Sequence, residues 1–249
     1  MTNSPAPKIS VLLPAYLGER YLPAQLDSIL PQMGPSDELI ISDDSPPDKP
    51  ATWALAEQYA AKDRRVKVLR GPGRGVIRNV EFLLGQAKGE YIFLSDQDDV
   101  WLPRKLEKAR SALEAGALLA MHDATLTDAD LHPTGRTLFE ERGAGAGTAK
   151  NILRNGYTGC CMAFRREFLA YALPFPKHIP MHDQWLGLLA ERHGEVVWIT
   201  EPLLLHRRHE SAQTIRGGSA AQKIKWRLEI MAALAVAKRV RKKWNVKEK

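Results

Sequence analysis

Strand signals and helix signals alternate along the first hundred residues of this chain. Short segments rich in β-branched and aliphatic residues predict strands, and the segments between them carry apolar residues at helical spacing. The predicted strands lie at 9–13, 38–42, 66–69 and 91–94, and the predicted helices at 21–30, 52–61 and 77–87. This alternation predicts an α/β fold with a mainly parallel central sheet flanked by helices.

The second half of the chain continues this pattern with fewer signals. The predicted elements are strands at 157–164, 195–199 and 203–209 and a helix at 183–191. Between the halves, Gly143–Gly147 alternates glycine with alanine and predicts a linker or a mobile loop. We expect one domain over residues 1–215 and a basic, helical tail over 216–249.

A run of carboxylates follows the predicted strand at 91–94, where Asp96, Asp98 and Asp99 fall within four residues. Ligands of open α/β sheets bind outside the carboxyl ends of the strands. Carboxylates this close repel one another unless a cation or hydrogen-bond donors hold them. The pattern favours a site for a hard divalent metal ion that carries a phosphate ligand. The alternative is an acidic turn that caps a helix.

The net charge of +7 is concentrated at the end of the chain. Residues 219–249 hold ten Lys or Arg and two Glu, so the preceding 218 residues sum to −1. A nucleic-acid-binding domain carries its basic patch on the folded body, so we expect no nucleic-acid partner. If the tail is helical, one stripe comprises Trp226, Ile230, Ala233, Ala237, Val240 and Trp244. That stripe either binds an anionic membrane surface or packs on the domain.

The cysteines and the first residues indicate a cytoplasmic protein. Cys160 and Cys161 are adjacent and supply neither a disulfide framework nor the spacing of zinc ligands. The first eight residues lack the charged and apolar regions of a secretory signal, and no run of about 18 apolar residues predicts a membrane span. If the tail binds lipid, we expect a peripheral position on the inner face of the cell membrane.

A set of short motifs is spread along the chain, and its members are Ile9–Tyr16, Glu38–Ser45, Arg74–Asn79, Asp96–Trp101, His182–Trp185 and Arg207–His209. Each is weak alone, but their order resembles that of family 2 glycosyltransferases with the GT-A fold, over roughly residues 8–215. Rhamnosyltransferase-like enzymes of bacterial surface-polysaccharide synthesis are the most similar. The resemblance implies metal-dependent, inverting transfer of a sugar, by analogy rhamnose, from a UDP- or dTDP-sugar to a growing, lipid-linked polysaccharide.

The resemblance places the metal site at Asp98, the ligand of the Asp-x-Asp motif, and at His209. Oxygen ligands suit Mg²⁺ or Mn²⁺, and an added imidazole favours Mn²⁺. His206 is the alternative ligand if the motif is aligned in a shifted register. The position of His209 directly after two arginines favours His209. Asp96 is expected near the ribose or a metal-bound water. Asp99 either binds the metal, hydrogen-bonds nearby or caps the following helix.

The resemblance assigns donor binding to Pro14, Tyr16, Asp43, Asp44 and Arg78. Asp44 is the preferred acceptor for the ring N–H of uracil or thymine, whereas Asp43 can instead satisfy the backbone amides of its loop. Tyr16 either stacks on the base or fills the edge of the sheet. Arg78 is expected to reach the base or the diphosphate, because a guanidinium suits phosphate oxygens.

The resemblance makes Asp183 the general base that takes the proton of the acceptor hydroxyl. Because Asp183 opens a predicted helix, a plain N-cap is the alternative. His182 is a candidate to orient Asp183 or the acceptor, and Trp185 either lines the acceptor pocket or packs inward. Two other classes stay open, a nucleotide-sugar-binding domain without turnover and a membrane-associated adaptor. Only the enzyme requires Asp183.

Overall fold

The computed structural model describes residues 8–209 and 219–244, and the side chains of the last segment as far as residue 237. In this part of the chain one sheet has nine strands, which are β1 (Ile9–Ala15), β2 (Glu38–Asp43), β3 (Val66–Arg70), β4 (Tyr91–Leu94), β5 (Val100–Trp101), β6 (Leu119–Thr127), β7 (Pro133–Thr137), β8 (Met162–Arg165) and β9 (Val196–Arg207). The predicted boundary at residues 215 and 216 lies outside the described residues.

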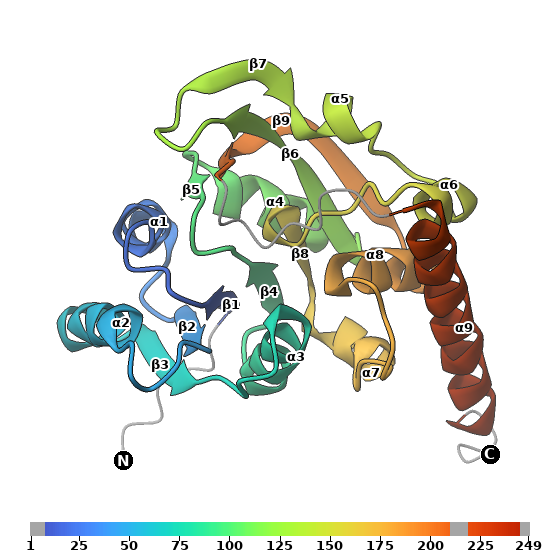
Figure 1. Cartoon of the computed structure of the whole chain (residues 1–249), viewed down its shortest axis with the longest axis horizontal. Coiled ribbons are helices and arrows are strands. Elements are labelled where there is room, and N and C mark those ends of the chain that lie inside the picture. Colours follow the sequence, from blue (N-terminus) through green and yellow to red (C-terminus); the bar gives the residue numbers. More distant parts are fainter. Residues whose placement is uncertain (1–7, 210–218, 245–249) are drawn as a thin grey trace.

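The helices connect and cover these strands (Figure 1). They are α1 (Leu22–Ile29), α2 (Ala51–Lys62), α3 (Val76–Gln86), α4 (Lys105–Glu114), α5 (Leu138–Arg142), α6 (Thr148–Leu153), α7 (Leu169–Ala172), α8 (His182–His193) and α9 (Ala220–Trp244), with short 3₁₀ turns η1 (Leu30–Gln32), η2 (Gly159–Cys161) and η3 (Arg166–Phe168). In Figure 1, α1 and α2 lie on one face of the sheet and α3 lies on the other. No helix among the described residues is both long and apolar enough to cross a bilayer.

The strand order is β3-β2-β1-β4-β8-β6-β9-β5, with β7 paired to β6. Strand β1 pairs in parallel with β2 and with β4, and β2 pairs in parallel with β3. Strand β8 then runs antiparallel to both β4 and β6. The carboxyl ends of β1, β2 and β4 therefore meet at one edge of the sheet, where ligands of α/β folds bind.

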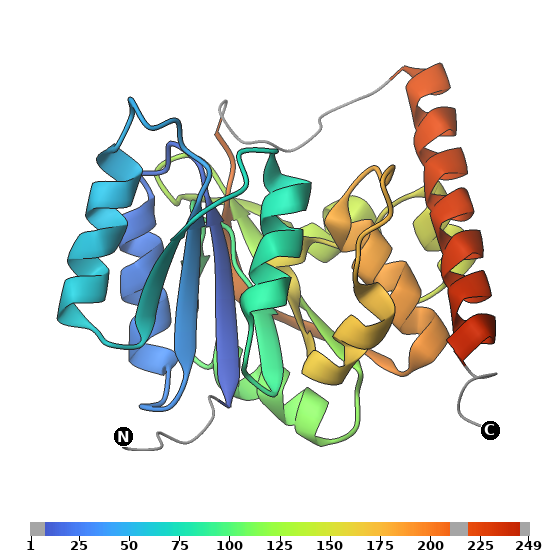
Figure 2. The same cartoon turned by 90° about the horizontal axis from the view of Figure 1, so that it is seen from below.

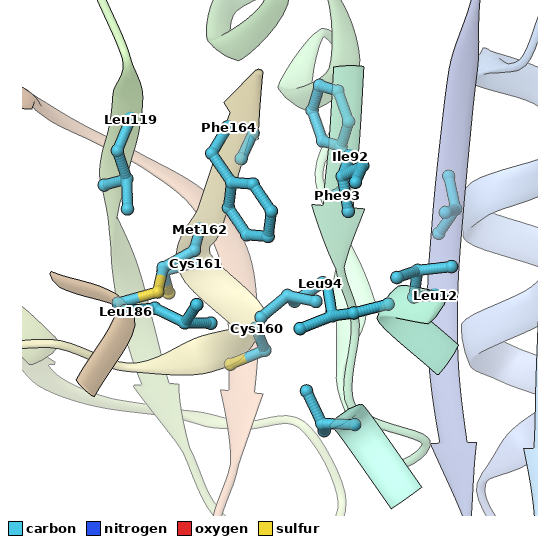
Figure 3. Packing of buried hydrophobic residues seen from close by; sticks show 14 of the residues in the cluster. Leu12, Ile92, Phe93, Leu94, Leu119, Cys160, Cys161, Met162, Phe164 and Leu186 are labelled. Atoms are coloured by element: carbon cyan, nitrogen blue, oxygen red, sulfur yellow. The ribbon is translucent and has the colours of Figure 1, made fainter. Parts of the chain in front are cut away.

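One apolar core fills the space between the sheet and its helices. Strand β1 is buried along almost its whole length because it lies inside the sheet with helices on both faces, which explains its continuous apolar run. Figure 3 shows the centre of this core, where residues of β1, β4, β6 and β8 meet and both cysteines lie among apolar side chains. The two thiols are free and buried.

The structure confirms the predicted α/β class and every predicted strand and helix of the first hundred residues, with small shifts of their ends. The second half differs more. Of the strand predicted at 157–164, only residues 162–164 belong to a strand, β8, and residues 159–161 form the turn η2. The two predicted strands at 195–199 and 203–209 are one long strand, β9. Strand β6 and helix α4 lacked a clear pattern and were not predicted. Residues 143–147 connect α5 to α6, as expected of a linker.

Candidate functional site

The loop that follows β4 carries three carboxylates into a small volume. One ligand oxygen each of Asp96, Asp98 and Asp99 lies within 4.8 Å of the others. The loop stands at the carboxyl edge that β4 shares with β1 and β2. The predicted acidic cluster is therefore assembled in three dimensions as well as in the sequence.

Asp98 forms an ion pair with His209, which lies just beyond the end of β9. The Oδ2 atom of Asp98 is 2.7 Å from Nε2 of His209, and the Asp98 side chain keeps 18% of its surface exposed. The His209 ring also lies 4.7 Å from the ring of Tyr21, and the guanidinium of Arg207 lies 4.7 Å from the centre of the same Tyr21 ring. The structure thus brings together the two residues predicted as metal ligands. We call Asp98 and His209 the outer pair.

Asp99 forms a second carboxylate–imidazole pair one residue further along. Its Oδ1 atom accepts hydrogen bonds from Nδ1 of His206 at 3.0 Å and from the backbone N–H of Arg207 at 3.1 Å. The Asp99 side chain is fully buried, and its Oδ2 atom has no partner among the described residues. We call Asp99 and His206 the inner pair. The capping alternative for Asp99 is wrong, because Arg104 holds the N-cap position of the next helix.

The acids of this cluster have pKa values displaced in opposite directions. Burial, together with the charges of Asp99 and Asp98, raises the pKa of Asp96 to about 8. Burial and the charge of Asp99 also raise the pKa of Asp98, although His209 opposes this. Burial would raise the pKa of Asp99 as well, but His206 lowers it below its usual value. The anionic forms of Asp96 and Asp98 are therefore disfavoured in the protein alone, and a bound cation would stabilise them.

A buried lysine behind the inner pair was missed from the sequence. Lys105 is almost fully buried, and its ammonium group donates to the carbonyl of Cys160 at 2.6 Å and lies 4.1 Å from the ring centre of Trp101. The ligand atoms of Asp99, Cys160 and His206 lie within 4.8 Å of one another. Burial lowers the pKa of Lys105, and nearby anions oppose that shift. A lysine in the first turn of an amphipathic helix gives no sequence signal for such a position.

The two acids at the end of β2 have different surroundings. Asp43 is buried, accepts from the backbone N–H of Ser45 at 2.9 Å and pairs with Arg70 at 3.3 Å. This is the local loop role predicted as its alternative. Asp44 is only partly buried, and the backbone N–H of Gly73 donates to its Oδ1 atom at 2.9 Å. A Cβ at Gly71 would lie 2.1 Å from that oxygen, so glycine is required for this close approach.

The loop after β1 is fastened to the acidic cluster by Gln97, which sequence reasoning missed. The Gln97 amide accepts from the backbone N–H of Tyr16 at 2.9 Å and donates to the Tyr16 carbonyl at 3.0 Å. A Cβ at Gly18 would lie 2.0 Å from the Gln97 oxygen. Tyr16 is 44% exposed, so it does not fill the sheet edge and is accessible to a planar ligand. Pro14 pairs in register with Ser42 of β2 at the same edge.

Arg78 lies in the first turn of α3 but contacts another part of the chain. Its guanidinium forms an ion pair with Glu81 at 2.5 Å and donates to the carbonyls of Pro176 and Lys177 at 3.1 and 3.0 Å. The Arg78 side chain therefore holds the segment after α7. Its predicted contact with the base or diphosphate stays a prediction, and forming it would require Arg78 to leave these acceptors.

Asp183 is buried near the start of α8, where Met181 occupies the N-cap position, so the capping alternative is wrong. Its Oδ1 atom accepts from the Asn155 side chain at 3.2 Å and from the Gln184 backbone at 2.5 Å. His182 is buried, and a Cβ at Gly159 would lie 2.8 Å from its Nε2 atom. Because Gly159 precedes Cys160, this contact brings the start of α8 close to the inner pair.

Trp185 packs inward. Its side chain is 2% exposed, and its indole N–H donates to the carbonyl of Ala172 at 3.1 Å. Trp185 is therefore part of the packing between α7 and α8, and it supports the position of Asp183 rather than lining an acceptor pocket.

Known proteins share this sequence pattern and this fold. The model of "Glycosyl transferase family 2" matches residues 10–171. EpsE of Bacillus subtilis (strain 168), named as a glycosyltransferase, is 37% identical over 110 residues, which cover 43% of this chain and 39% of EpsE. TuaG of the same strain, named as a teichuronic acid biosynthesis glycosyltransferase, is 36% identical over 202 residues, which cover 76% of this chain and 74% of TuaG.

A further relative and a solved structure extend the comparison. WfgD of Escherichia coli, a UDP-Glc:α-D-GlcNAc-diphosphoundecaprenol β-1,3-glucosyltransferase, is 24% identical over 185 residues, which cover 74% of this chain and 70% of WfgD. Residues 1–349 of TarS from S. aureus, in complex with UDP-GlcNAc, superpose with a TM-score of 0.69 at 18% identity, covering 92% of this chain and 66% of that one. This likeness confirms the predicted GT-A-type fold.

Proposed function

This chain belongs to glycosyltransferase family 2, and on that premise we propose that it is a metal-dependent, inverting enzyme of surface-polysaccharide synthesis. It would transfer a sugar from a UDP- or dTDP-sugar to a growing, lipid-linked polysaccharide, at the inner face of the cell membrane. The matched segment spans 39% of the length of EpsE and 74% of that of TuaG.

The observation that carries the proposal is the outer pair beside Asp96. Asp98 and His209 are 111 residues apart in the chain, yet their side chains meet at 2.7 Å at the carboxyl edge of the sheet. The edge also presents Asp44 at the end of β2 and the exposed ring of Tyr16 after β1. A nucleotide bound across this edge would have an acceptor for its base, an aromatic face and a metal-binding group for its diphosphate.

The residues of this edge fit a divalent metal ion. Asp98 and His209 would hold Mn²⁺ or Mg²⁺, with Asp96 next to it, and the imidazole favours Mn²⁺. The pKa values of Asp96 and Asp98 are raised, so both groups favour their protonated forms until a cation binds. When bound, the ion neutralises charge on the departing nucleoside diphosphate. Its identity, like the direct roles of Pro14 and Arg78, belongs to the proposal.

Asp183 is the proposed general base. Its Oδ1 atom is already held by Asn155 and by the backbone of Gln184, which fixes the carboxylate in one orientation. The carboxylate would accept the proton of the acceptor hydroxyl as that oxygen attacks the anomeric carbon from the side opposite the leaving diphosphate, which inverts the configuration. His182, buried beside Gly159, would support this orientation by packing.

The donor and the acceptor are proposed at different levels of support. UDP as the nucleotide is supported by the name of the TarS complex and by that of WfgD. A polysaccharide acceptor is supported by the name of TuaG, and a lipid diphosphate carrier by that of WfgD. Rhamnose as the sugar rests only on the order of the sequence motifs.

A thermal-shift panel tests the proposal, using UDP, dTDP, GDP, CDP and ADP, each with Mn²⁺, Mg²⁺ or EDTA. A ligand that binds only the folded protein stabilises it by about 2.7 kcal/mol at a hundredfold excess over its dissociation constant. We expect a metal-dependent shift with UDP or dTDP. If no nucleotide raises the melting temperature, the proposed donor site is wrong.

The variant Asp183→Asn separates an enzyme from a binding domain. We expect transfer to fall by about 10²–10⁴-fold, the usual contribution of a general base, while the UDP-dependent thermal shift stays as in wild type. Asn155→Ala is the matched control for orientation, because it removes one hydrogen bond to Asp183 and leaves the carboxylate in place. Unchanged transfer by Asp183→Asn would exclude its role as the base.

A further inference from the structure

Helix α9 packs on the body of the protein through one face. Ile230, Ala233 and Leu234 are buried against α6 and α8. Two arginines fasten the contact, since Arg192 of α8 donates to the carbonyl of Leu234 and Arg227 donates to that of Leu153, both at 2.9 Å. Figures 1 and 2 both show α9 along one side of the molecule. Its orientation relative to the sheet is therefore fixed by side-chain packing.

The stripe that the sequence suggested for lipid binding is this packing face. Ile230 and Ala233 are buried, and Trp226 and Ala237 are half-buried. The side chains of Val240 and Trp244 lie outside the described residues. For the described part of that stripe, the structure shows the predicted alternative, packing on the domain.

The opposite face of α9 carries a different apolar stripe. Ile224, Leu228 and Met231 are 54%, 58% and 43% exposed. Their spacing of four and three residues places them within an arc of about 60° on a helix with 3.6 residues per turn. Among the described residues, no element covers them. We call these three residues the outward stripe. Exposed aliphatic side chains that align in this way mark an interaction surface more often than scattered ones do.

The positive charge of the tail favours an anionic lipid surface over a second copy of the protein as the partner of the outward stripe. Residues 219–249 hold ten Lys or Arg and two Glu, and exposed Lys223 and Lys225 lie on either side of the stripe. A second copy of α9 would bring two strongly basic helices together, which repel each other. An anionic lipid surface attracts the same charges and accepts the apolar side chains at the boundary between headgroups and acyl chains.

We propose that the outward stripe of α9 docks the protein on a bilayer of anionic lipids. The first turn of α9 lies toward the same end of the molecule as the carboxyl ends of β1 and β2 (Figure 2). This inference deepens the proposed function and rests on it for its purpose, since a lipid-linked acceptor shares that surface. The binding itself can be measured without any transfer reaction.

Co-sedimentation with vesicles tests the docking. Wild-type protein is expected to sediment with vesicles that contain phosphatidylglycerol and to stay in solution with phosphatidylcholine alone. Leu228→Glu and Met231→Glu are each expected to weaken vesicle binding by about tenfold or more. Gln222→Glu is the matched control, because it changes the charge by the same amount on the same helix but away from the outward stripe, and we expect vesicle binding within about twofold of wild type.

Three outcomes would overturn the proposal. The first is a wild-type protein that does not bind anionic vesicles, and the second is equal loss of binding by Leu228→Glu and Gln222→Glu. The third is a wild-type dimer in light scattering that Leu228→Glu dissociates, which would assign the outward stripe to a second copy. Unchanged melting temperatures and UDP-dependent thermal shifts of the variants would show that folding and the donor site are intact, so a failure of docking is distinguishable from a failure of the proposed function.

Discussion

Asp98 and Asp99 are neighbours in the chain, yet each forms an ion pair of a different kind. The outer pair, Asp98 with His209, keeps its carboxylate partly exposed at the sheet edge, whereas the carboxylate of the inner pair is fully buried. Asp99 receives two hydrogen bonds on one oxygen, from His206 and from the backbone of Arg207. One pair is therefore open to a ligand and the other is enclosed by the protein.

The pKa values of the two acids express this difference. The pKa of Asp98 is raised by burial and by the charge of Asp99, so its anion is poorly compensated in the absence of a cation. The pKa of Asp99 is lowered despite burial, because His206 and the backbone of Arg207 stabilise its anion. Two neighbouring acids of one motif can therefore serve different purposes. Asp98 stays available for a metal ion, whereas Asp99 forms part of the buried structure behind it.

The largest expected effect separates the pairs by activity. Asp98→Asn is expected to lower transfer on the order of 10³-fold, because it removes the proposed metal ligand at the departing diphosphate. Its melting temperature should stay close to that of wild type, since the poorly compensated anion contributes little stability. Steady-state assays of UDP release measure the first quantity. Wild-type activity in Asp98→Asn would contradict the division of roles.

The second effect separates the pairs by stability. Asp99→Asn breaks a buried ion pair and leaves the His206 cation without its partner, which costs about 3–5 kcal/mol. Urea denaturation measures the free energy of unfolding. Asp98→Asn is the matched control, and we expect it within about 1 kcal/mol of wild type because burial and the charge of Asp99 offset the stabilisation that the Asp98 anion gains from His209. The reverse order of stabilities would show that the outer pair carries the structural role.

The third effect is a pH dependence specific to the inner pair. Burial opposes protonation of His206, but Asp99 raises its pKa to about 9 from an ordinary 6.5. A group with a raised pKa contributes its full stability below the unfolded-state value and loses it as the pH rises through the folded-state value. The difference in unfolding free energy between wild type and His206→Gln should therefore shrink by about 3 kcal/mol from pH 6 to pH 10. A difference that stays constant over this range would contradict a charged inner pair.

The smallest effect concerns Gln97, which links the outer pair to the loop after β1. Gln97→Ala removes two hydrogen bonds to the backbone of Tyr16, which are worth about 1–2 kcal/mol together. We expect a several-fold higher KM for the donor with little change in kcat, because the loop that carries the Tyr16 ring loses its anchor. A fall in kcat at unchanged KM would instead place Gln97 in the chemical step.

Much of the fold could be predicted because its signals are local. The strands β1, β2, β3 and β4 are short apolar runs, and parallel pairing brings their carboxyl ends to one edge without further information. The meeting of Asp98 with His209 was predicted from the order of the motifs. Strand β6 was missed because its polar residues, including His122 and Asp123, are buried inside the sheet and hide the apolar pattern.

The remainder depends on contacts between distant segments. The two imidazoles contact different acids, since His206 in β9 binds Asp99 and His209 beyond the strand binds Asp98. The choice of His209 as the metal ligand stays a prediction. The hydrogen bonds of Arg78 to the carbonyls of Pro176 and Lys177 join segments almost a hundred residues apart, and no local sequence pattern predicts them. The packing of Lys105 over Trp101 is likewise tertiary.

Calorimetric titration of Mn²⁺ in the presence of UDP tests the division between the two pairs most directly. Wild type, Asp98→Asn and Asp99→Asn are compared at a temperature at which all three are folded. We predict that Asp98→Asn raises the dissociation constant for Mn²⁺ by about a hundredfold or more, whereas Asp99→Asn changes it by less than about tenfold. Loss of Mn²⁺ binding in folded Asp99→Asn, with wild-type affinity in Asp98→Asn, would contradict the account.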